Sequence, residues 1–532
     1  MRINQFAPYA KKPHFVNGKS SKICRLISGM VLMVKRLIIF GFICLLVACG
    51  KSAPDTNGQS NAIQQPIRFA IAQAPLNLDP RYATDAASER VNRLIYRSLI
   101  DFDKAAKLKP DLATWVEISP TQYRFTLLNS REQPRSLFHN NSPLTSRDVV
   151  ATYQSLSTLK DSPHTAEFAN ISRVEALNND SVDFYLVQPD TNFVAKLIIG
   201  ILPEALIKAG HDFVHHPIGG GPLKFVSWKN NLQLQRIADQ QDFILSEVKD
   251  PTVRVLKLMR GEADLLQGDL PPELVKYLQK QNDITVQSSI GANFSYIGFN
   301  MRDPVLSKLE VRQAIAHVID RKAIIQQAML ADSREAGAIL PPEHWAGNPN
   351  LPPYDYNPKL ARELLQKAGV KLPLKLVYKT STDAQRVRLA TMMQAQMREA
   401  GIELEIRSLD WGTFFSDIKQ GDFQLYGLTW VGIKTPEIYA KAFGSQSIPP
   451  QGANRGHFQD KALDDLMLSA QNASQKKADW QKVTTYIHHA LPYVPLWYEG
   501  QFSAMHKTLV NYELQPDGNW DGLKTIKVEN AH

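Results

Sequence analysis

The residues that could carry chemistry form no recognised catalytic motif. The signatures HExxH, GxSxG and GxxxxGK[ST] are absent from the 532 residues, so zinc peptidase, serine hydrolase and phosphate-loop chemistry lack support. The acids Asp264, Asp422 and Glu437 could act in acid–base pairs, but their spacing shows no pair and favours a solvated face or a helix cap. These residues therefore give catalysis no support, but they do not exclude it.

Two histidine pairs could suggest a metal site. His215 with His216, and His488 with His489, are adjacent in sequence. Adjacent side chains diverge on a strand or a helix, so neither pair chelates alone, and no carboxylate spacing supports them. We predict no metal site and no cofactor. The triplet Gly219–Gly221 lacks the Lys and Ser or Thr of a phosphate loop and indicates a tight turn or a close backbone approach.

The segment Leu428–Tyr439, LTWVGIKTPEIY, is the strongest candidate for a binding site. At the end of an apolar strand it contains an aromatic residue, Trp430, a glycine that permits a turn, Gly432, and one lysine, Lys434. Thr435 and Pro436 are typical of a helix start, which would aim the positive end of that helix at the same place. We expect the ligand-binding residues to include Trp430, Val431, Gly432, Ile433, Lys434 and Thr435.

A strand–helix–strand unit positions this segment. Ile402, Leu404 and Ile406 alternate as a strand, Asp410 caps a short helix that Gly421 ends, and 423–430 returns as a strand. Such a unit predicts parallel strands joined by a right-handed crossover, and ligands bind beyond the carboxyl ends of strands in open α/β sheets. The segment Leu428–Tyr439 occupies such an end.

The rest of the chain alternates helix and strand signals, which indicates an α/β fold. Capping boxes at Ser307 with Glu310 and at Thr382 with Gln385 predict two helix starts, and Asn357 predicts a third. The earlier part is richer in strands. The expected strands there are 67–71, 123–128, 182–187, 232–237 and 296–299, and the expected helices include 88–99 and 146–156.

Charge and cysteine both concentrate at the N-terminus. The net charge is +9, yet residues 1–48 carry eight Lys or Arg and no acid, so the remainder is close to neutral. A nucleic-acid partner is therefore not expected. All three cysteines, Cys24, Cys44 and Cys49, lie in the first fifty residues, so the body has no internal disulfide or thiolate site.

The N-terminus predicts export with a lipid anchor. Residues 37–48 form an apolar run of twelve behind Lys35 and Arg36, which suits a signal peptide ending at 48. The final residues resemble a lipobox, with Cys49 as the lipidated residue and 49–65 as a flexible tether. A soluble-secretion cleavage site or a buried apolar segment stays an alternative. Met33 could be the functional start.

An ordered series of motifs runs through the body. The series comprises LNLDP at Leu76, LIYRSLIDFD at Leu94, LKPDLATWV at Leu108, YRFTL at Tyr123, FHNNSPLTSRDVVATY at Phe138, PIGGGPLKF at Pro217, GEADLL at Gly261, YIGFNM at Tyr296, VRQAIAHVIDRKAI at Val311, YNPKLARELLQKAGV at Tyr356 and GIELEIRSLDWGTFFSDIKQGDF at Gly401. In this order it resembles the family 5 extracellular solute-binding proteins, the dipeptide, oligopeptide and nickel receptors of bacterial ABC importers.

The resemblance implies a two-lobed, hinge-closing α/β receptor of the periplasmic-binding-protein type. Lobe one would take 66–300 and 496–532, with an extra subdomain at about 100–215, and lobe two 301–495. Such a receptor would be a monomer that traps a peptide-like or other small solute between its lobes and delivers it to the permease. It would not be an enzyme. It would face the periplasm, or the cell exterior in a one-membrane bacterium. A ligand-sensing receptor of this fold, or a secreted hydrolase, stays an alternative.

Departures from the family pattern concern the ligand. Relatives often carry an acid after the Gly of a W-x-G-D phrase, where it pairs with the α-amine of a peptide, but this chain has Ile433. The neighbouring Lys434 would favour a neutral or anionic group, unless its ammonium extends to solvent. Gly220, and the region 236–249, also depart from the family pattern. Trp411 and Tyr439 are the expected wall residues, although Trp411 also suits a core position.

Overall fold

A computed structural model describes residues 65–103, 106–129, 135–159, 162–165, 167–329, 332–472 and 477–529. The predicted signal peptide and the lipidated Cys49 lie outside the described residues, as does the tether up to residue 64. Within the described ranges, the helices are all too short or too polar to cross a membrane.

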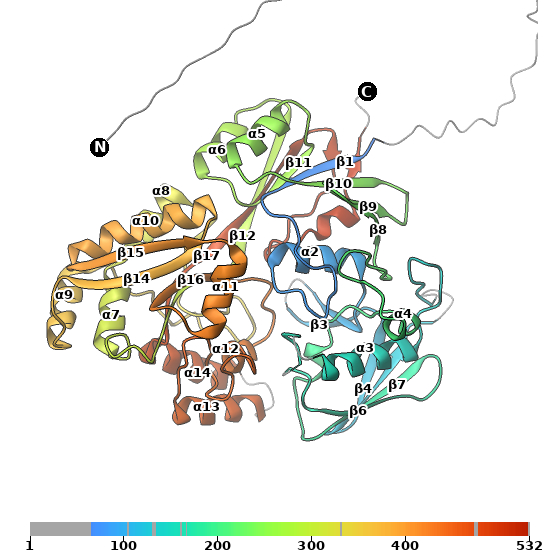
Figure 1. The fold of residues 1–532 in the computed structure, drawn as a ribbon, viewed down its shortest axis with the longest axis horizontal. Helices are drawn as coiled ribbons and strands as arrows, with labels where there is room; N and C mark the ends of the chain where they lie inside the picture. The colour runs from blue at the N-terminus through green and yellow to red at the C-terminus, as the bar shows by residue number, and fades with distance from the viewer. Residues whose placement is uncertain are drawn as a thin grey trace, which may run out of the picture. The chain divides into compact units, whose positions relative to one another are not determined.

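One mixed sheet of eleven strands runs through the body (Figure 1). Its order is β15-β14-β16-β12-β17-β11-β1-β10-β9-β8, and β13 pairs with β17 outside this path. The strands are β1 Ile67–Ile71, β8 Leu223–Trp228, β9 Leu232–Arg236, β10 Asp242–Glu247, β11 Leu265–Gln267, β12 Ile284–Phe299, β13 Arg334–Glu335, β14 Leu374–Ser381, β15 Ile402–Leu409, β16 Leu425–Trp430 and β17 Tyr493–His506.

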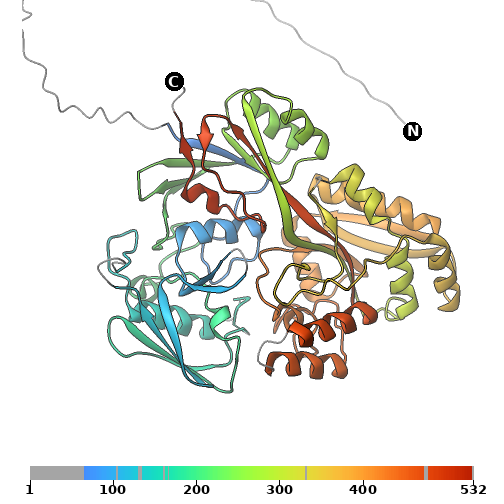
Figure 2. The same ribbon diagram turned by 180° about the vertical axis from the view of Figure 1, so that it is seen from behind.

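The long antiparallel strands β12 and β17 connect the two ends of this sheet, and Figure 2 shows them side by side. Their register is interrupted: Ser289 faces Gln501 but Asn293 faces Glu499, so β12 holds extra residues there. Such a bulge bends a strand without ending its pairing. Gly291 lies in the bulge, where any Cβ atom would overlap the carbonyl oxygen of Glu499. Only glycine fits this crossing.

Helices and two apolar clusters surround the β14–β16 end of the sheet (Figure 1). The helices of this half are α7 Leu309–His317, α8 Arg321–Ala328, α9 Pro358–Lys367, α10 Ala384–Glu399, α11 Trp411–Gln420, α12 Ile438–Phe443, α13 Lys461–Asn472 and α14 Lys477–Ala490. The first cluster includes α7 to α10, and the second, which we call the aromatic cluster, includes α11 to α14 with Phe294 and Tyr296 of β12. Neighbouring residues of β12 therefore point into different cores.

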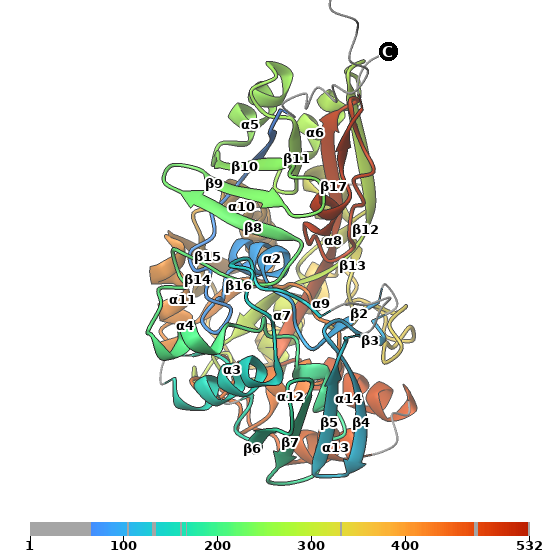
Figure 3. The same ribbon diagram turned by 90° about the vertical axis from the view of Figure 1, so that its right-hand side faces the viewer.

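The β8–β11 end carries its own helices and a smaller sheet, visible in Figure 3. The four-stranded sheet β4-β5-β7-β6 packs with α3 around a separate apolar cluster. The remaining elements are α2 Ala86–Ile95, β2 Ile100–Phe102, β3 Leu108–Pro110, β4 Ala113–Ser119, β5 Gln122–Leu127, α3 Ser146–Thr158, β6 Ile171–Ala176, β7 Ser181–Leu186, η1 Val194–Lys196, α4 Glu204–Lys208, α5 Pro251–Met259, α6 Pro272–Leu278, β18 Leu509–Val510, η2 Asp521–Lys524 and β19 Lys527–Val528.

The predicted strand–helix–strand unit is confirmed. Strands β15 and β16 both pair in parallel with β14, which lies between them. Asp410 caps α11 by accepting a hydrogen bond from the Thr413 amide at 3.1 Å, and Gly421 ends that helix with φ of +77°. These local signals predicted the element correctly because a cap and its partners lie within four residues of each other.

Both predicted capping boxes are wrong. The N-cap of α7 is Lys308, without a side-chain bond, while the Ser307 hydroxyl donates to the Pro304 carbonyl. The N-cap of α10 is Asp383, and Gln385 donates its amide to the Ala328 carbonyl. In both cases the side chain expected to take part in the capping box donates its hydrogen bond to a backbone carbonyl elsewhere. Helix α2 also ends at Ile95, four residues before the predicted end at residue 99.

Candidate functional site

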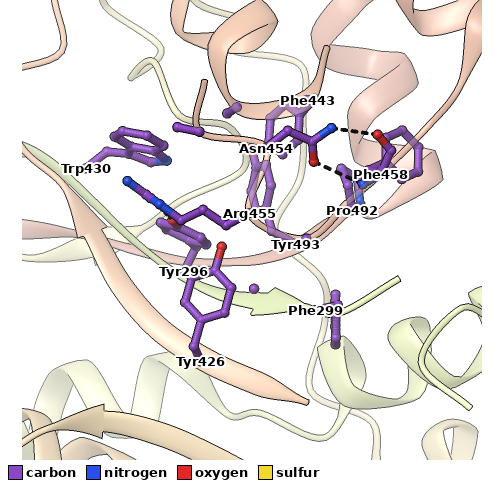
Figure 4. Close-up of a pocket in the computed structure, with 14 residues that line it drawn as sticks. Tyr296, Phe299, Tyr426, Trp430, Phe443, Asn454, Arg455, Phe458, Pro492 and Tyr493 are labelled. Atoms are coloured by element: carbon purple, nitrogen blue, oxygen red, sulfur yellow. Dashed lines mark hydrogen bonds between the residues drawn. The ribbon is translucent and has the colours of Figure 1, made fainter. Parts of the chain in front are cut away.

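The end of β16 presents an aromatic face. Trp430 lies opposite Phe294 in the β12 register, and its ring stacks on that of Tyr296 with 6.3 Å between centroids and 11° between planes. The Arg455 guanidinium lies 4.8 Å from the Trp430 ring centroid and donates to the Tyr296 hydroxyl at 3.1 Å (Figure 4). A guanidinium over an indole is held by attraction to the ring quadrupole.

The stack continues onto α11. Arg455 also lies 5.4 Å from the ring centroid of Phe415, whose ring stacks on Trp411 at 5.4 Å and 9°. Within the described ranges no acid forms a salt bridge with Arg455. A cavity of about 20 Å³ lies between Arg455, Trp430 and Tyr296, and such a volume holds a water molecule but no solute.

The opposite face of the same strands carries a polar network. Glu499 of β17 accepts from the hydroxyls of Ser295 and Thr429, the latter at 3.1 Å, and from Arg386 of α10 at 2.5 and 3.2 Å. Burial by itself would raise the pKa of the Glu499 carboxyl, but the charge and hydrogen bonds of Arg386 hold that pKa below its usual value. The network ties β12, β16 and β17 to α10.

The turn after β16 contains the residues singled out by the sequence. Gly432 has φ of +68°, a conformation that favours glycine, and the space around its Cα is open. Ile433 packs, partly buried, against the aromatic cluster. The Lys434 ammonium pairs with Asp517 at 2.7 Å, and the Lys434 carbonyl contacts the His344 ring at 2.8 Å. Lys434 is thus neither free for a ligand nor extended to solvent.

The helix predicted to begin at Thr435 begins three residues later. Tight turns, with Ile438 bonded to Thr435 at 3.4 Å and Tyr439 bonded to Pro436 at 3.0 Å, precede α12, whose N-cap is Glu437. Helix α12 has only six residues. The predicted N-cap at Thr435 is therefore wrong, and so short a helix gives no basis for a positive terminus at the site.

The two predicted wall residues lie in different surroundings. Trp411 is the first residue of α11 and is partly buried against the aromatic cluster. Tyr439 is completely buried, and its hydroxyl accepts from the Leu340 amide at 3.3 Å. Burial raises the pKa of the Tyr439 hydroxyl. Trp411 thus lies near Trp430 through the stack, whereas Tyr439 belongs to the core.

Polar contacts connect the two ends of the sheet at this site. Lys441 of α12 pairs with Glu167 at 3.5 Å, and the Thr191 hydroxyl donates to the Gln471 carbonyl at 2.8 Å. Burial would raise the pKa of the Glu167 carboxyl, but Lys441 and His164 hold it at about 2. With Lys434 and Asp517, these contacts join the turn after β16, α12 and α13 to segments from the other half.

The remaining sequence candidates have local roles. Asp264 binds the Arg68 guanidinium at 2.9 Å, Asp422 pairs with Lys379 at 3.2 Å, and His215 contacts Asp212 at 2.9 Å. Among the described residues, no three His, Cys, Asp or Glu side chains could hold a metal ion.

The glycine triplet marks a close approach to α2. A Cβ atom at Gly219 or Gly221 would overlap the carbonyl oxygens at the end of that helix, and the Gly221 amide donates to the Ile95 carbonyl at 2.7 Å. This agrees with the predicted close backbone approach.

Sequence reasoning missed the residues that complete the site. Arg455 and Glu499 carry no local motif, and Asp517 lies 83 positions from its partner Lys434. Arg386 is one of several Arg residues on α10. The spatial pairing of these residues decides their role.

The long paired strands β12 and β17 join the two ends of the sheet, and a polar and aromatic site lies beside them. This architecture is that of a two-lobed α/β binding protein. The chain belongs to the bacterial extracellular solute-binding proteins, family 5, whose model matches residues 107–448. It is therefore a substrate-binding receptor of the class that delivers ligand to ABC importers, and members of this family are extracellular or periplasmic binding proteins.

Similar proteins bind peptides or peptide-like solutes of different sizes. Di/tripeptide-binding protein 1 of Pseudomonas aeruginosa is 25% identical, over 85% of this chain and 92% of that protein. The glutathione-binding protein GsiB of Shigella flexneri is 26% identical, over 89% and 94%. The oligopeptide-binding protein AppA of Bacillus subtilis, solved with a nonapeptide, has the same fold with a TM-score of 0.79 and 23% identity, covering 88% of this chain and 99% of that one.

Proposed function

We propose that this receptor captures a peptide-like or other small solute beside the turn at residues 430–435 and passes it to an ABC permease. The observation that carries the proposal is the ion pair between Lys434, in this turn, and Asp517, in the C-terminal segment. This ion pair joins the two halves beside the proposed ligand position. A ligand bound there would contact both halves and would therefore favour the closed state.

The lobe limits are part of the proposal. Lobe one would comprise 66–300 and 496–532, with the extra subdomain at about 100–215, and lobe two 301–495. The positions of β12 and β17 support these limits, since both strands pass between the two ends of the sheet. The bulge at Gly291 is a suitable place for hinge bending.

The anchor and the absence of catalysis also belong to the proposal. Cys49 would carry the lipid, and the chain would act as a monomer in the periplasm or on the outer face of the cell membrane. Its similarity to binding proteins supports a role without turnover. We expect Cys49→Ser to move the protein from the membrane to the soluble fraction, and unchanged fractionation would contradict the anchor.

Native mass spectrometry of gently purified protein tests the proposed function. We expect a small solute to remain bound and to dissociate with its mass unchanged after prolonged incubation. Progressive conversion of that solute would favour a hydrolase. Protein that carries no solute, and acquires none from a cell extract, would contradict the receptor role.

A further inference from the structure

Of the three acids that the sequence singled out, only Glu437 lacks a cationic partner among the described residues. Asp264 binds Arg68, and Asp422 pairs with Lys379. Both carboxylate oxygens of Glu437 are buried, and neither has a hydrogen-bond partner of ordinary geometry in the described part of the chain. Glu437 directly follows the turn that contains Lys434 and Thr435. A buried carboxylate without a cationic partner therefore lies next to the turn of the candidate site.

The nearby cations are already paired with other acids. Lys434 pairs with Asp517, and Lys441 pairs with Glu167. Lys196, whose charge acts on Glu437 from the other half, pairs with Asp190 at 2.6 Å. Around Glu437 the uncompensated charge is therefore negative, which reverses the anionic or neutral preference expected from Lys434 and from a helix at Thr435. The Arg455 guanidinium, which also has no acid partner among the described residues, lies in the aromatic stack on Trp430.

A buried carboxylate without a partner is unfavourable, so it either takes up a proton or gains a cation from outside. Burial raises the pKa of the Glu437 carboxyl, with the charge of Asp190 adding to this effect and Thr435 and Lys196 opposing it. No group of three potential metal ligands surrounds it within the described ranges. An organic cation therefore suits the site better than a metal ion.

We propose that Glu437 is a specificity-determining residue that binds an ammonium or guanidinium group of the transported solute. The inference rests on the proposed function and names the charge of its ligand. In the solute-bound state the cation would donate hydrogen bonds to the two Glu437 oxygens, and the desolvation of the carboxylate would be offset by the new pair. Selection against neutral solutes follows, since they leave the carboxylate unpartnered.

A pair of peptide mixtures tests this selection. The first is a tryptic casein digest, and the second is the same digest after acetylation of its amines and removal of the remaining cations on a cation exchanger. Wild type, Glu437→Gln and Glu363→Gln are unfolded, dialysed to remove bound solute, refolded and exposed to each mixture. Glu363 is an exposed residue of α9 and controls for loss of one negative charge. Native mass spectrometry reads the bound peptides.

We expect wild type and Glu363→Gln to bind peptides from the first mixture only, and Glu437→Gln to bind them at least tenfold more weakly. Equal binding of the cation-depleted mixture by wild type, or undiminished binding by Glu437→Gln, would overturn the inference. A wild-type protein that binds neither mixture but retains a solute without a cationic group keeps its receptor role and loses this inference. Failure to bind any solute would remove both proposals.

Discussion

Two carboxylates beside the end of β16 are treated in opposite ways by the fold. Glu499 accepts four hydrogen bonds from Arg386, Ser295 and Thr429, and the pKa of its carboxyl is lowered. Glu437 has no partner of ordinary geometry among the described residues, and the pKa of its carboxyl is raised. The two carboxylates differ in the hydrogen-bond donors and counter-charges that the rest of the chain provides for them.

This difference separates structure from recognition. The hydrogen bonds and the charge of Arg386 offset the desolvation of Glu499 within the protein, so that carboxylate can stabilise the crossing strands in every state. The desolvation of Glu437 is not offset by the protein itself. A buried carboxylate that lacks a protein partner is expected where a ligand supplies that partner. Burial without a partner therefore indicates a functional site.

Substitution of Arg386, the counter-charge of Glu499, should have the largest effect on stability. Arg386→Met leaves Glu499 with two hydroxyl partners and no counter-charge, and we expect a loss of about 3 kcal/mol in the free energy of unfolding, measured by urea denaturation. Arg388→Met is the matched control on the same helix. Its bidentate partner Glu273 is 60% exposed, so the loss should stay below about 1 kcal/mol. Equal losses in both variants would remove the distinction drawn for Glu499.

Lys434 tests whether the site is neutralised by the protein's own charges. Lys434→Met leaves Asp517, whose side chain is 9% exposed, with only Asn519 as a partner among the described residues. We expect thermal unfolding to report a loss of about 1.5 kcal/mol. Lys461→Met is the control, because that lysine is 86% exposed and pairs with an exposed Asp465. A stability unchanged from wild type would show that Lys434 is solvated and that a cation is available at the site.

The elements around the site were predictable where the signals are local. Asp410 and Gly421 delimit α11 through contacts within one helical turn, and alternation of apolar residues placed β15 and β16. The capping boxes at Ser307 and Thr382 failed because a neighbouring residue, Lys308 or Asp383, occupies the N-cap instead. A motif four residues long gives the presence of a helix start better than its position.

The chemistry of the site was not predictable in the same way. The sequence placed Trp430 and Lys434 in one candidate segment, but the partner of the Lys434 ammonium is Asp517, 83 positions away. Glu437 looked like a solvated acid or a helix cap, and it is the N-cap of α12 without a side-chain cap bond. The charges of Lys196 and Asp190, which lie far from Glu437 in sequence, also act on its carboxyl, and no periodicity in the sequence records this.

Acid titration should distinguish Glu499 from Glu437. Because the native pKa of Glu499 lies below its ordinary value of 4.5, its stabilisation is fully present above pH 4.5 and is lost as the pH falls through the native pKa. We expect wild type to exceed Glu499→Gln in stability at pH 7. Below pH 4.5 this gap should narrow by up to about 1.4 kcal/mol for every tenfold rise in proton concentration, until the native pKa is passed. Chemical denaturation between pH 7 and 3 measures the gap. A gap independent of pH would mean that Glu499 is not ionised in the native state.

Glu437→Gln should show the smallest effect and the opposite dependence on pH. The native pKa of Glu437 lies above 4.5, so the folded state loses stability as the pH rises from 4.5 through that native pKa. Without ligand, Glu437→Gln should match wild type at pH 4 and exceed it at pH 8, by up to about 1 kcal/mol. The same denaturation series measures this gap, with Glu363→Gln as the control. A variant less stable than wild type at pH 8 would show that the protein itself supplies a partner for Glu437, and the contrast with Glu499 would then disappear.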